Sequence, residues 1–197
     1  MKSLMLTLLL LATNQVFALG EAIQPANSFP QVKLITSMGD IVIELERRRA
    51  PLTVNKFLYL TQQKEYDNTI FHRIIANFVV QGGGVTPNMK QKKPDNQIPN
   101  ESGNGLTNDY GTIAMARETY PHSASRQFFF NLNPDGNNNL NPNSRRWGYT
   151  VFGSVVEGIE VLEKMSKTHT GTDQRLGWND VPLTPIYLKK AIILPQF

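Results

Sequence analysis

Arg73 is a charged residue within a mostly apolar stretch that ends in three consecutive glycines. In an extended strand, side chains alternate between two faces, so Phe71, Arg73 and Ile75 would share one face. His72 and Ile74 would lie on the other. An arginine on an apolar face must either pair with an anion or point into a site that uses its charge. Taken alone, the stretch favours an ordinary ion pair with a carboxylate.

Three further segments follow this stretch along the chain. They are Gly-Thr-Ile-Ala-Met-Ala-Arg at 111–117, Ser-Arg-Gln-Phe-Phe-Phe-Asn at 125–131 and Gly-Tyr-Thr-Val-Phe-Gly at 148–153. Together with residues 71–84 they resemble, in order and spacing, the motifs of the cyclophilins, a family of peptidyl-prolyl cis-trans isomerases. They look most like the bacterial periplasmic branch of that family. The resemblance runs from about Val32 to Ile193, so it covers nearly the whole chain after the leader.

The chemistry of this family suits an arginine. A prolyl amide rotates slowly because resonance gives its C–N bond partial double-bond character, with a barrier of about 18–20 kcal/mol. In the twisted state the nitrogen is pyramidal and can accept a hydrogen bond. A fixed guanidinium aimed at this nitrogen would stabilise the twisted state more than either planar isomer, which lowers the barrier. Arg73 falls on the family's catalytic arginine, and this chemistry requires no nucleophile, metal or cofactor.

The resemblance also implies a groove that binds proline-containing polypeptides. The residues that match the family's proline pocket are Phe78, Val79, Phe129 and Leu140. The other substrate-binding positions are the matched glutamines Gln81 and Gln127, the peptide-pairing edge at Ala116 and Arg117, and Tyr149. Core packing is the competing interpretation for every aromatic side chain. The match favours the pocket for Phe78 and Phe129, and it leaves Phe71, Phe128 and Phe152 as expected core residues.

Several positions depart from the family pattern. Val79 stands where many members carry methionine, which makes a shorter and stiffer pocket wall. Asn139 and Tyr149 replace the tryptophan and histidine of members that bind cyclosporin tightly, so we expect weak or no cyclosporin binding. Arg126 replaces a small hydroxyl residue. Residues 133–143 are rich in Asn and Pro and are predicted to form a surface loop close to the pocket.

Hydrophobic periodicity predicts a mainly β fold. Eight strands are expected at residues 32–36, 41–46, 70–75, 78–81, 112–116, 127–131, 150–156 and 186–194. Pro51 and the apolar residues after it predict a helix from Pro51 to Lys64, and a second helix is expected near Gly158 to Lys167. The strand count agrees with the family's fold, an eight-stranded antiparallel closed barrel capped by two α-helices. The polar stretch from Gly82 to Tyr110 is predicted to be a long functional loop.

A leader precedes the domain. Lys2 supplies positive charge, the apolar run from Leu4 to Ala12 is too short to span a bilayer, and Ala18 is the small residue that a signal peptidase favours. We therefore expect cleavage after Ala18, export to the periplasm and no membrane association afterwards. The predicted organisation is a signal peptide, a flexible lead-in and one cyclophilin-like isomerase domain, over residues 1–18, 19–30 and 31–197.

Composition argues against several other classes of protein. The chain of 197 residues has a formal net charge of +4, and its one basic triplet, Arg47 to Arg49, is better explained as a turn before Pro51 than as a nucleic-acid patch. It has no cysteine and only three histidines, which lack ligand spacing, so neither a disulfide framework nor a metal site is expected. We expect no cofactor, no nucleic acid partner and a monomer.

Two functional classes remain open at this point. The first is an isomerase that accelerates Xaa-Pro interconversion in unfolded or partly folded exported proteins, a step slow enough to limit folding. The second is a module that uses the same groove to bind proline-containing segments, as a chaperone or adhesion partner, with little turnover. The presence of Arg73 favours the enzyme, because ground-state binding does not depend on stabilising a twisted amide. A lipocalin-type barrel that binds small molecules fits the pattern of strands and helices less well.

Overall fold

The structure is a computed structural model that describes residues 22–93, 95–174 and 176–196. The predicted signal peptide, its cleavage after Ala18 and the first residues of the lead-in lie outside this part of the chain. Within the described ranges, no helix is long and apolar enough to cross a membrane.

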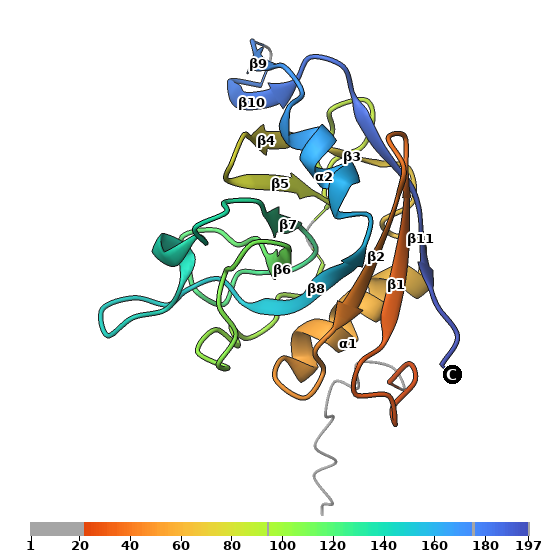
Figure 1. The fold of residues 1–197 in the computed structure, drawn as a ribbon, viewed down its shortest axis with the longest axis vertical. Coiled ribbons are helices and arrows are strands. Elements are labelled where there is room, and N and C mark those ends of the chain that lie inside the picture. Colours follow the sequence, from red (N-terminus) through yellow and green to blue (C-terminus); the bar gives the residue numbers. More distant parts are fainter. Residues whose placement is uncertain (1–21, 94, 175, 197) are drawn as a thin grey trace, which may run out of the picture.

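In the part of the chain that the structure describes, nine antiparallel strands form one sheet that curls into a nearly closed barrel (Figure 1). Its strands are β1 (Gln31–Thr36), β2 (Asp40–Leu45), β3 (Thr69–Phe71), β4 (Arg73–Ile75), β5 (Val79–Gly82), β6 (Thr112–Met115), β7 (Phe128–Asn131), β8 (Val151–Glu157) and β11 (Ile186–Ile193). They lie side by side in the order β3-β11-β1-β2-β8-β6-β7-β5-β4. The barrel class expected from the sequence is confirmed, with one more strand than the eight expected.

The additional strand results from a break at His72. The sequence predicted one strand over residues 70–75, but β3 pairs with β11 whereas β4 pairs with β5. Because β3 and β4 are the two ends of the sheet order and only His72 separates them, the chain itself joins the two edges of the barrel. The break also resets the alternation of side chains. Phe71 and Ile74 both belong to the core, so the prediction that Phe71 shares a face with Arg73 was wrong.

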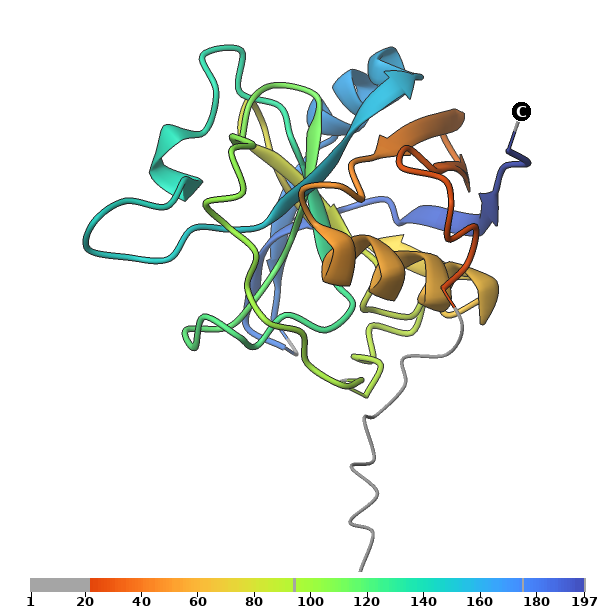
Figure 2. The ribbon, with the colours of Figure 1, turned by 90° about the horizontal axis from the view of Figure 1, so that it is seen from below.

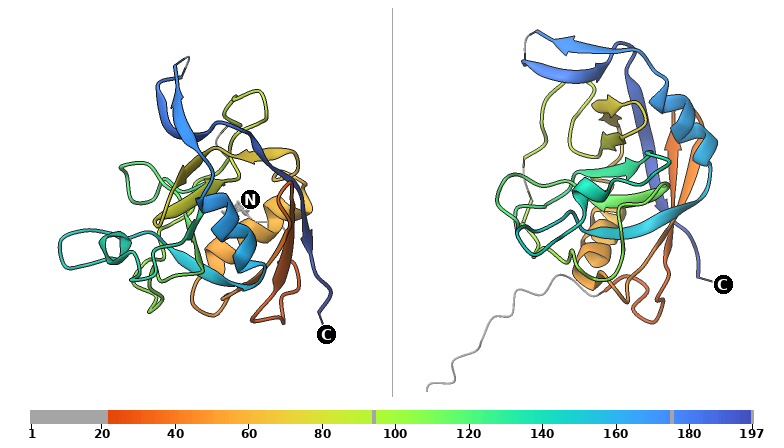
Figure 3. Two further views of the ribbon diagram at one scale, coloured as in Figure 1. Left: turned by 45° about the horizontal axis from the view of Figure 1, so that its top comes forward. Right: turned by 60° about the vertical axis from the view of Figure 1, so that its left-hand side comes forward.

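Among the described residues, two α-helices lie at opposite ends of the barrel (Figures 2 and 3). Helix α1 (Pro51–Gln62) begins with proline in its first turn, as predicted, and buries Val54, Phe57 and Leu58 completely. It ends two residues before the predicted Lys64, which has a positive φ of 58°. Helix α2 (Ile159–Ser166) lies within the predicted range and directs Val161, Leu162 and Met165 inward.

The interior of the barrel contains a cluster of aromatic side chains. The ring of Phe57 from α1 lies 4.9 Å from that of Tyr66 and 5.6 Å from that of Phe128, measured between centroids. Burial raises the pKa of Tyr66 far above its usual value, and its hydroxyl donates to the carbonyl of Arg126 at 3.1 Å. Phe71, Phe128 and Phe152 are all core residues, as expected. This packing fixes β7, the strand that carries Phe129 into the site.

The long segment from Gly82 to Tyr110 is held against α1 by ion pairs and hydrogen bonds. The buried ammonium of Lys56 lies 2.7 Å from the carboxylate of Asp95. Glu65 pairs with both Lys92 and Arg126, at 2.7 and 2.9 Å. Arg126, one of the departures from the family pattern, thus connects the residues before β7 to the segment that follows α1.

The carboxylate of Glu101 attaches the later part of this segment to the start of α1. It accepts hydrogen bonds from the backbone N–H groups of Leu52 and Thr53, at 3.1 and 2.9 Å. These N–H groups lie in the first turn of α1, where an α-helix provides no internal acceptors. The long loop is therefore fixed to the same helix at several points along its length.

A two-stranded hairpin was not expected from the sequence. It consists of β9 (Thr170–Asp173) and β10 (Trp178–Pro182), and β10 lies close to β4 (Figure 3). A short 3-10 turn, η1 (Asn138–Leu140), also forms inside the predicted surface loop. Both elements border the site described next.

Candidate active site

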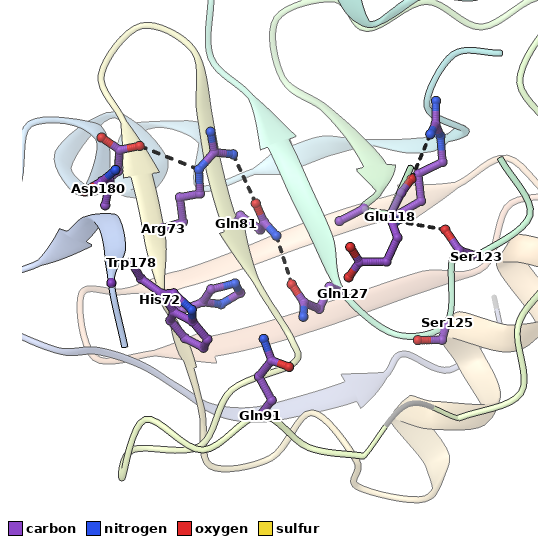
Figure 4. A pocket seen from close by; sticks show the side chains of 14 residues that line it. His72, Arg73, Gln81, Gln91, Glu118, Ser123, Ser125, Gln127, Trp178 and Asp180 are labelled. Atoms are coloured by element: carbon purple, nitrogen blue, oxygen red, sulfur yellow. Dashed lines mark hydrogen bonds and ion pairs between the residues drawn. The ribbon is translucent and has the colours of Figure 1, made fainter. Parts of the chain in front are cut away.

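Arg73 opens strand β4 and faces Gln81 across the pairing with β5. Its Nη1 donates to Oε1 of Gln81 at 3.3 Å, and Nε2 of Gln81 donates to Oε1 of Gln127 at 2.9 Å (Figure 4). Gln127 is the residue just before β7. The three side chains therefore form one row along neighbouring strands, and the row fixes one side of the guanidinium.

An acidic residue that the sequence did not indicate lies on the other side of the guanidinium. Oδ2 of Asp180, from β10, is 3.7 Å from Nε of Arg73 (Figure 4). The side chains of Arg73 and Asp180 are 39% and 40% exposed. An ion pair this exposed contributes little free energy, because water screens it. Its effect is on orientation: Gln81 and Asp180 contact different nitrogens of the same planar group.

His72 lies beside this arrangement and is almost fully buried. Burial lowers its pKa to about 4, so the ring is neutral at physiological pH. Its ring centroid is 6.1 Å from that of Trp178, and Nδ1 has no hydrogen-bond partner among the described residues. The ring packs between the barrel and the hairpin.

A small cavity of about 320 Å³ opens next to the guanidinium. Nine of the ten residues assigned to the site from the sequence line it: Arg73, Phe78, Val79, Gln81, Ala116, Arg117, Phe129, Leu140 and Tyr149. The base of this cavity is apolar, since Val79 and Phe129 are buried in a small cluster with Ala114 and Val151. The cavity combines an apolar base with a cationic side wall.

A second, larger cavity of about 550 Å³ adjoins the first. The two share Arg73, Gln81, Ala116 and Arg117 in their linings. Gln127, the tenth predicted residue, lines the larger one, as do Gln91, Glu118, Trp178 and Asp180 (Figure 4). Together the two cavities form a groove across the barrel wall, with Arg73 at its centre. The sequence did not indicate the contribution of Trp178 and Asp180 to this groove.

Arg117 differs from Arg73 in how its charge is used. Its guanidinium lies 4.6 Å above the ring of Tyr149 and donates to the carbonyls of Glu118 and Trp147, both at 2.9 Å. Further donation to Gly148 and Thr119, at 3.3 Å, joins two loops. The ring of Tyr149 in turn meets Phe129 edge-on, with centroids 5.5 Å apart. The Arg117 side chain therefore holds the pocket wall together.

Ala116 and Leu140 complete the groove from two different elements. The N–H of Ala116 donates to the carbonyl of Gln127 at 2.9 Å, which extends the β6–β7 pairing past the end of the strand. Leu140 is the last residue of η1 and packs against the small apolar cluster. The structure thus brings all ten sequence-assigned residues to one groove. Their roles toward a substrate stay predictions.

Comparison with known proteins identifies the family. Residues 31–192 match the family model described as cyclophilin type peptidyl-prolyl cis-trans isomerase/CLD. The chain belongs to the cyclophilin family. This cyclophilin is 46% identical over 164 residues to a peptidyl-prolyl cis-trans isomerase of Streptomyces antibioticus, covering 83% of this chain and 98% of the relative. It is 44% identical over 160 residues to peptidyl-prolyl cis-trans isomerase B of Escherichia coli K12, covering 80% and 96%.

Solved structures agree with this assignment. A crystal structure of a Cryptosporidium parvum cyclophilin type peptidyl-prolyl cis-trans isomerase superposes with a TM-score of 0.69 at 27% identity, covering 85% of this chain and 99% of the other. The same protein in the presence of the dipeptide Ala-Pro superposes with a TM-score of 0.67 at 27% identity, covering 84% and 99%. The family, the fold and the enzyme class named from the sequence motifs are confirmed.

Proposed function

We propose that this cyclophilin accelerates cis-trans isomerisation of Xaa-Pro bonds in exported proteins, and that Arg73 acts by stabilising the twisted prolyl amide. One observation carries the proposal. An oriented guanidinium, held by Gln81 on one side and Asp180 on the other, borders a small cavity with an apolar base. A proline ring in that cavity would have its amide nitrogen next to a fixed cation.

The proposed binding mode follows from the shape of the groove. The proline ring would occupy the small cavity against Phe129 and Val79, with Phe78 and Leu140 at its edges. The chain preceding the proline would run along the larger cavity past Gln127. Apolar contacts anchor the ring, and the polar groups around it limit the orientations that the peptide backbone can take. Binding would thus hold one side of the amide while the other side rotates.

The proposed catalytic step is a hydrogen bond that strengthens as the amide twists. In either planar isomer the nitrogen lone pair is delocalised and accepts poorly. In the twisted state it is localised on a pyramidal nitrogen, and the Arg73 guanidinium would donate to it. The guanidinium only donates a hydrogen bond in this step, so no proton is transferred. Differential stabilisation of this kind lowers the barrier without a covalent intermediate.

The cellular setting is part of the proposal. Lys2, the short apolar run that follows and Ala18 support a signal peptide, and a chain without cysteine needs no disulfides in an oxidising compartment. We propose that the mature protein works in the periplasm on unfolded or partly folded polypeptides, without attachment to the membrane. Sequencing the amino terminus of protein recovered from a periplasmic fraction would test this. A chain that still begins at Met1 would contradict it.

We propose two further properties. We infer that the protein is a monomer, which light scattering on a size-exclusion column would check. We also infer weak or no binding of cyclosporin, because Asn139 and Tyr149 replace a tryptophan and a histidine of the tightly binding members. Competition by cyclosporin at stoichiometric concentration in the isomerase assay would contradict that inference.

The isomerase assay tests the proposal most simply. The mature protein and its Arg73→Ala variant, matched by circular dichroism, are compared on a proline tetrapeptide. A loss of tenfold or more in the variant corresponds to at least about 1.4 kcal/mol of barrier lowering that depends on Arg73. If both proteins are equally slow while the folded wild type still binds proline peptides, the chain is a binding module instead.

A further inference from the structure

A chain of buried asparagine side chains lies directly behind the small cavity. Asn108 and Asn131 are completely buried and Asn137 is 1% exposed. Amide groups buried this deeply are costly unless they are hydrogen-bonded, so the pattern of their bonds shows what they hold in place.

Each side-chain amide in this row donates a hydrogen bond to the next one. Nδ2 of Asn137 donates to Oδ1 of Asn131 at 2.7 Å. Nδ2 of Asn131 donates to Oδ1 of Asn108 at 3.1 Å, and also to Oγ1 of Thr112 at 2.9 Å. Nδ2 of Asn108 then donates to Oδ1 of Asn141 at 2.9 Å. The row of amides begins and ends in the same surface loop, and between its ends it passes through Asn131 of β7 and Asn108 of the long segment before β6. The branch to Thr112 reaches β6.

The two ends of this chain flank the turn that carries Leu140. Asn137 precedes η1 and Asn141 follows it. The N–H of Leu140 donates to the carbonyl of Asn137 at 2.8 Å, while the carbonyl of Leu140 accepts from the N–H of Tyr149 at 2.9 Å. The residues that flank η1 are therefore hydrogen-bonded to two buried asparagines, Asn131 of β7 and Asn108 of the segment before β6. The positions of Leu140 and Tyr149 depend on that attachment.

Asn137 also reaches the opposite wall of the cavity. Its Nδ2 donates a second hydrogen bond, of 3.1 Å, to the carbonyl of Phe78. Phe78 precedes β5 and Leu140 ends η1, and both side chains line the cavity. One side chain thus bonds to the backbone of one wall and precedes the turn that forms the other. A shift of Asn137 would change the distance between the two walls.

We propose that the amide chain Asn137–Asn131–Asn108–Asn141 positions the walls of the small cavity and sets the size of ring that it accepts. The inference rests on the proposed function, in which this cavity holds the proline ring. Asn137 is then a positioning residue: it touches no substrate and acts through Phe78 and Leu140. The chemical class selected is a five-membered imino-acid ring over larger rings.

The test compares two substrates that differ only in ring size. Tetrapeptides containing proline or the six-membered pipecolic acid are assayed with wild type, Asn137→Ala and Asn141→Ala. We expect kcat/KM for proline to fall about tenfold in Asn137→Ala and the preference for proline over pipecolic acid to fall at least fivefold. Reduced folding or stability would lower both rates together and leave their ratio unchanged, so the ratio reports cavity width.

The controls keep the outcome interpretable. Asn143→Ala removes an exposed asparagine from the same loop, outside the amide chain and outside the cavity, and should leave the ratio as in wild type. If Asn137→Ala does not fold, Asn141→Ala alters the other, partly exposed end of the chain and allows the same measurement. Hydrogen exchange of the Tyr149 amide, bonded to Leu140, should accelerate in either folded variant.

Two results would count against the proposal in different ways. An unchanged substrate ratio together with an unchanged Tyr149 exchange rate would overturn the positioning role while leaving isomerase function intact. A wild-type protein that isomerises neither peptide would overturn the proposed function, and the positioning role with it.

Discussion

Nη1 of Arg73 lies 3.3 Å from Oε1 of Gln81, across the pairing of β4 with β5. This contact uses one donor of the guanidinium and fixes its plane relative to the barrel wall. Gln81 is itself held by Gln127 at 2.9 Å, so the orientation of Arg73 depends on a row of side chains rooted in three neighbouring strands or their ends. A catalytic group that must act at one point in a reaction benefits from such pre-organisation.

Removing the middle of this row should reduce turnover more than binding. In Gln81→Ala the guanidinium loses its neutral partner and can turn toward Asp180 or solvent. We expect kcat to fall about three- to tenfold, equivalent to roughly 1 kcal/mol, with KM changed less than twofold. Steady-state assays of the proline tetrapeptide measure both. Gln62→Ala, at the exposed end of α1, serves as control, and a Gln81→Ala variant with unchanged kcat would argue against the row.

The pair between Arg73 and Asp180 should have a small, salt-dependent effect. The two side chains are 39% and 40% exposed, so water and salt partly screen the interaction. Asp180→Asn keeps the shape of the side chain and tolerates the positive φ of 61° at this position. We expect less than a threefold change in kcat/KM at physiological salt and a larger change at low salt. Asp135→Asn, which changes an exposed carboxylate outside the groove, is the control. If the difference in kcat/KM between wild type and Asp180→Asn does not vary with ionic strength, the ion pair with Arg73 is not its cause.

His72 should make stability depend on pH in the acidic range. Burial lowers its pKa to about 4, below the usual value of 6.5, so the unfolded chain binds more protons than the folded one between these limits. The stability contributed by the neutral buried ring is fully present above pH 6.5 and is lost as the pH falls toward 4. We expect His72 to account for a loss on the order of 3 kcal/mol over that window.

Urea unfolding at several pH values would measure this loss. In His72→Gln, the free energy of unfolding should depend less steeply on pH between 6.5 and 4. The isomerase activity of the wild type should not change with pH between 7 and 8. Equal slopes in wild type and variant would show that His72 is not the group responsible.

The sequence predicted the barrel well because its signals are local. Alternating apolar residues identified the strands, and Pro51 identified the start of α1. The break at His72 was not predictable from alternation, since it arises where the chain leaves its pairing with β11 and joins β5. That requirement comes from barrel closure, which involves strands distant in the sequence.

The sequence predicted the site residues that belong to the family motifs. Leu140, assigned from the family resemblance, lines the cavity from η1, and Asn137 just before that turn is hydrogen-bonded to Asn131. Asp180 was missed because nothing near it alternates: the hairpin is short and polar, and it pairs with itself rather than with the barrel. Only the folded chain brings Asp180 to Arg73, from which it is separated by more than half of the sequence.

The central claim is that Arg73 stabilises the twisted amide through the geometry of its guanidinium, and Arg73→Lys tests it most directly. Lysine keeps the positive charge but lacks the planar fork that Gln81 and Asp180 orient. Exchange NMR on a proline peptide at saturating enzyme gives the turnover rate, and titration gives the dissociation constant. We predict that turnover falls at least tenfold while the dissociation constant changes less than twofold. Turnover equal to wild type, or a loss found entirely in binding, would contradict the account.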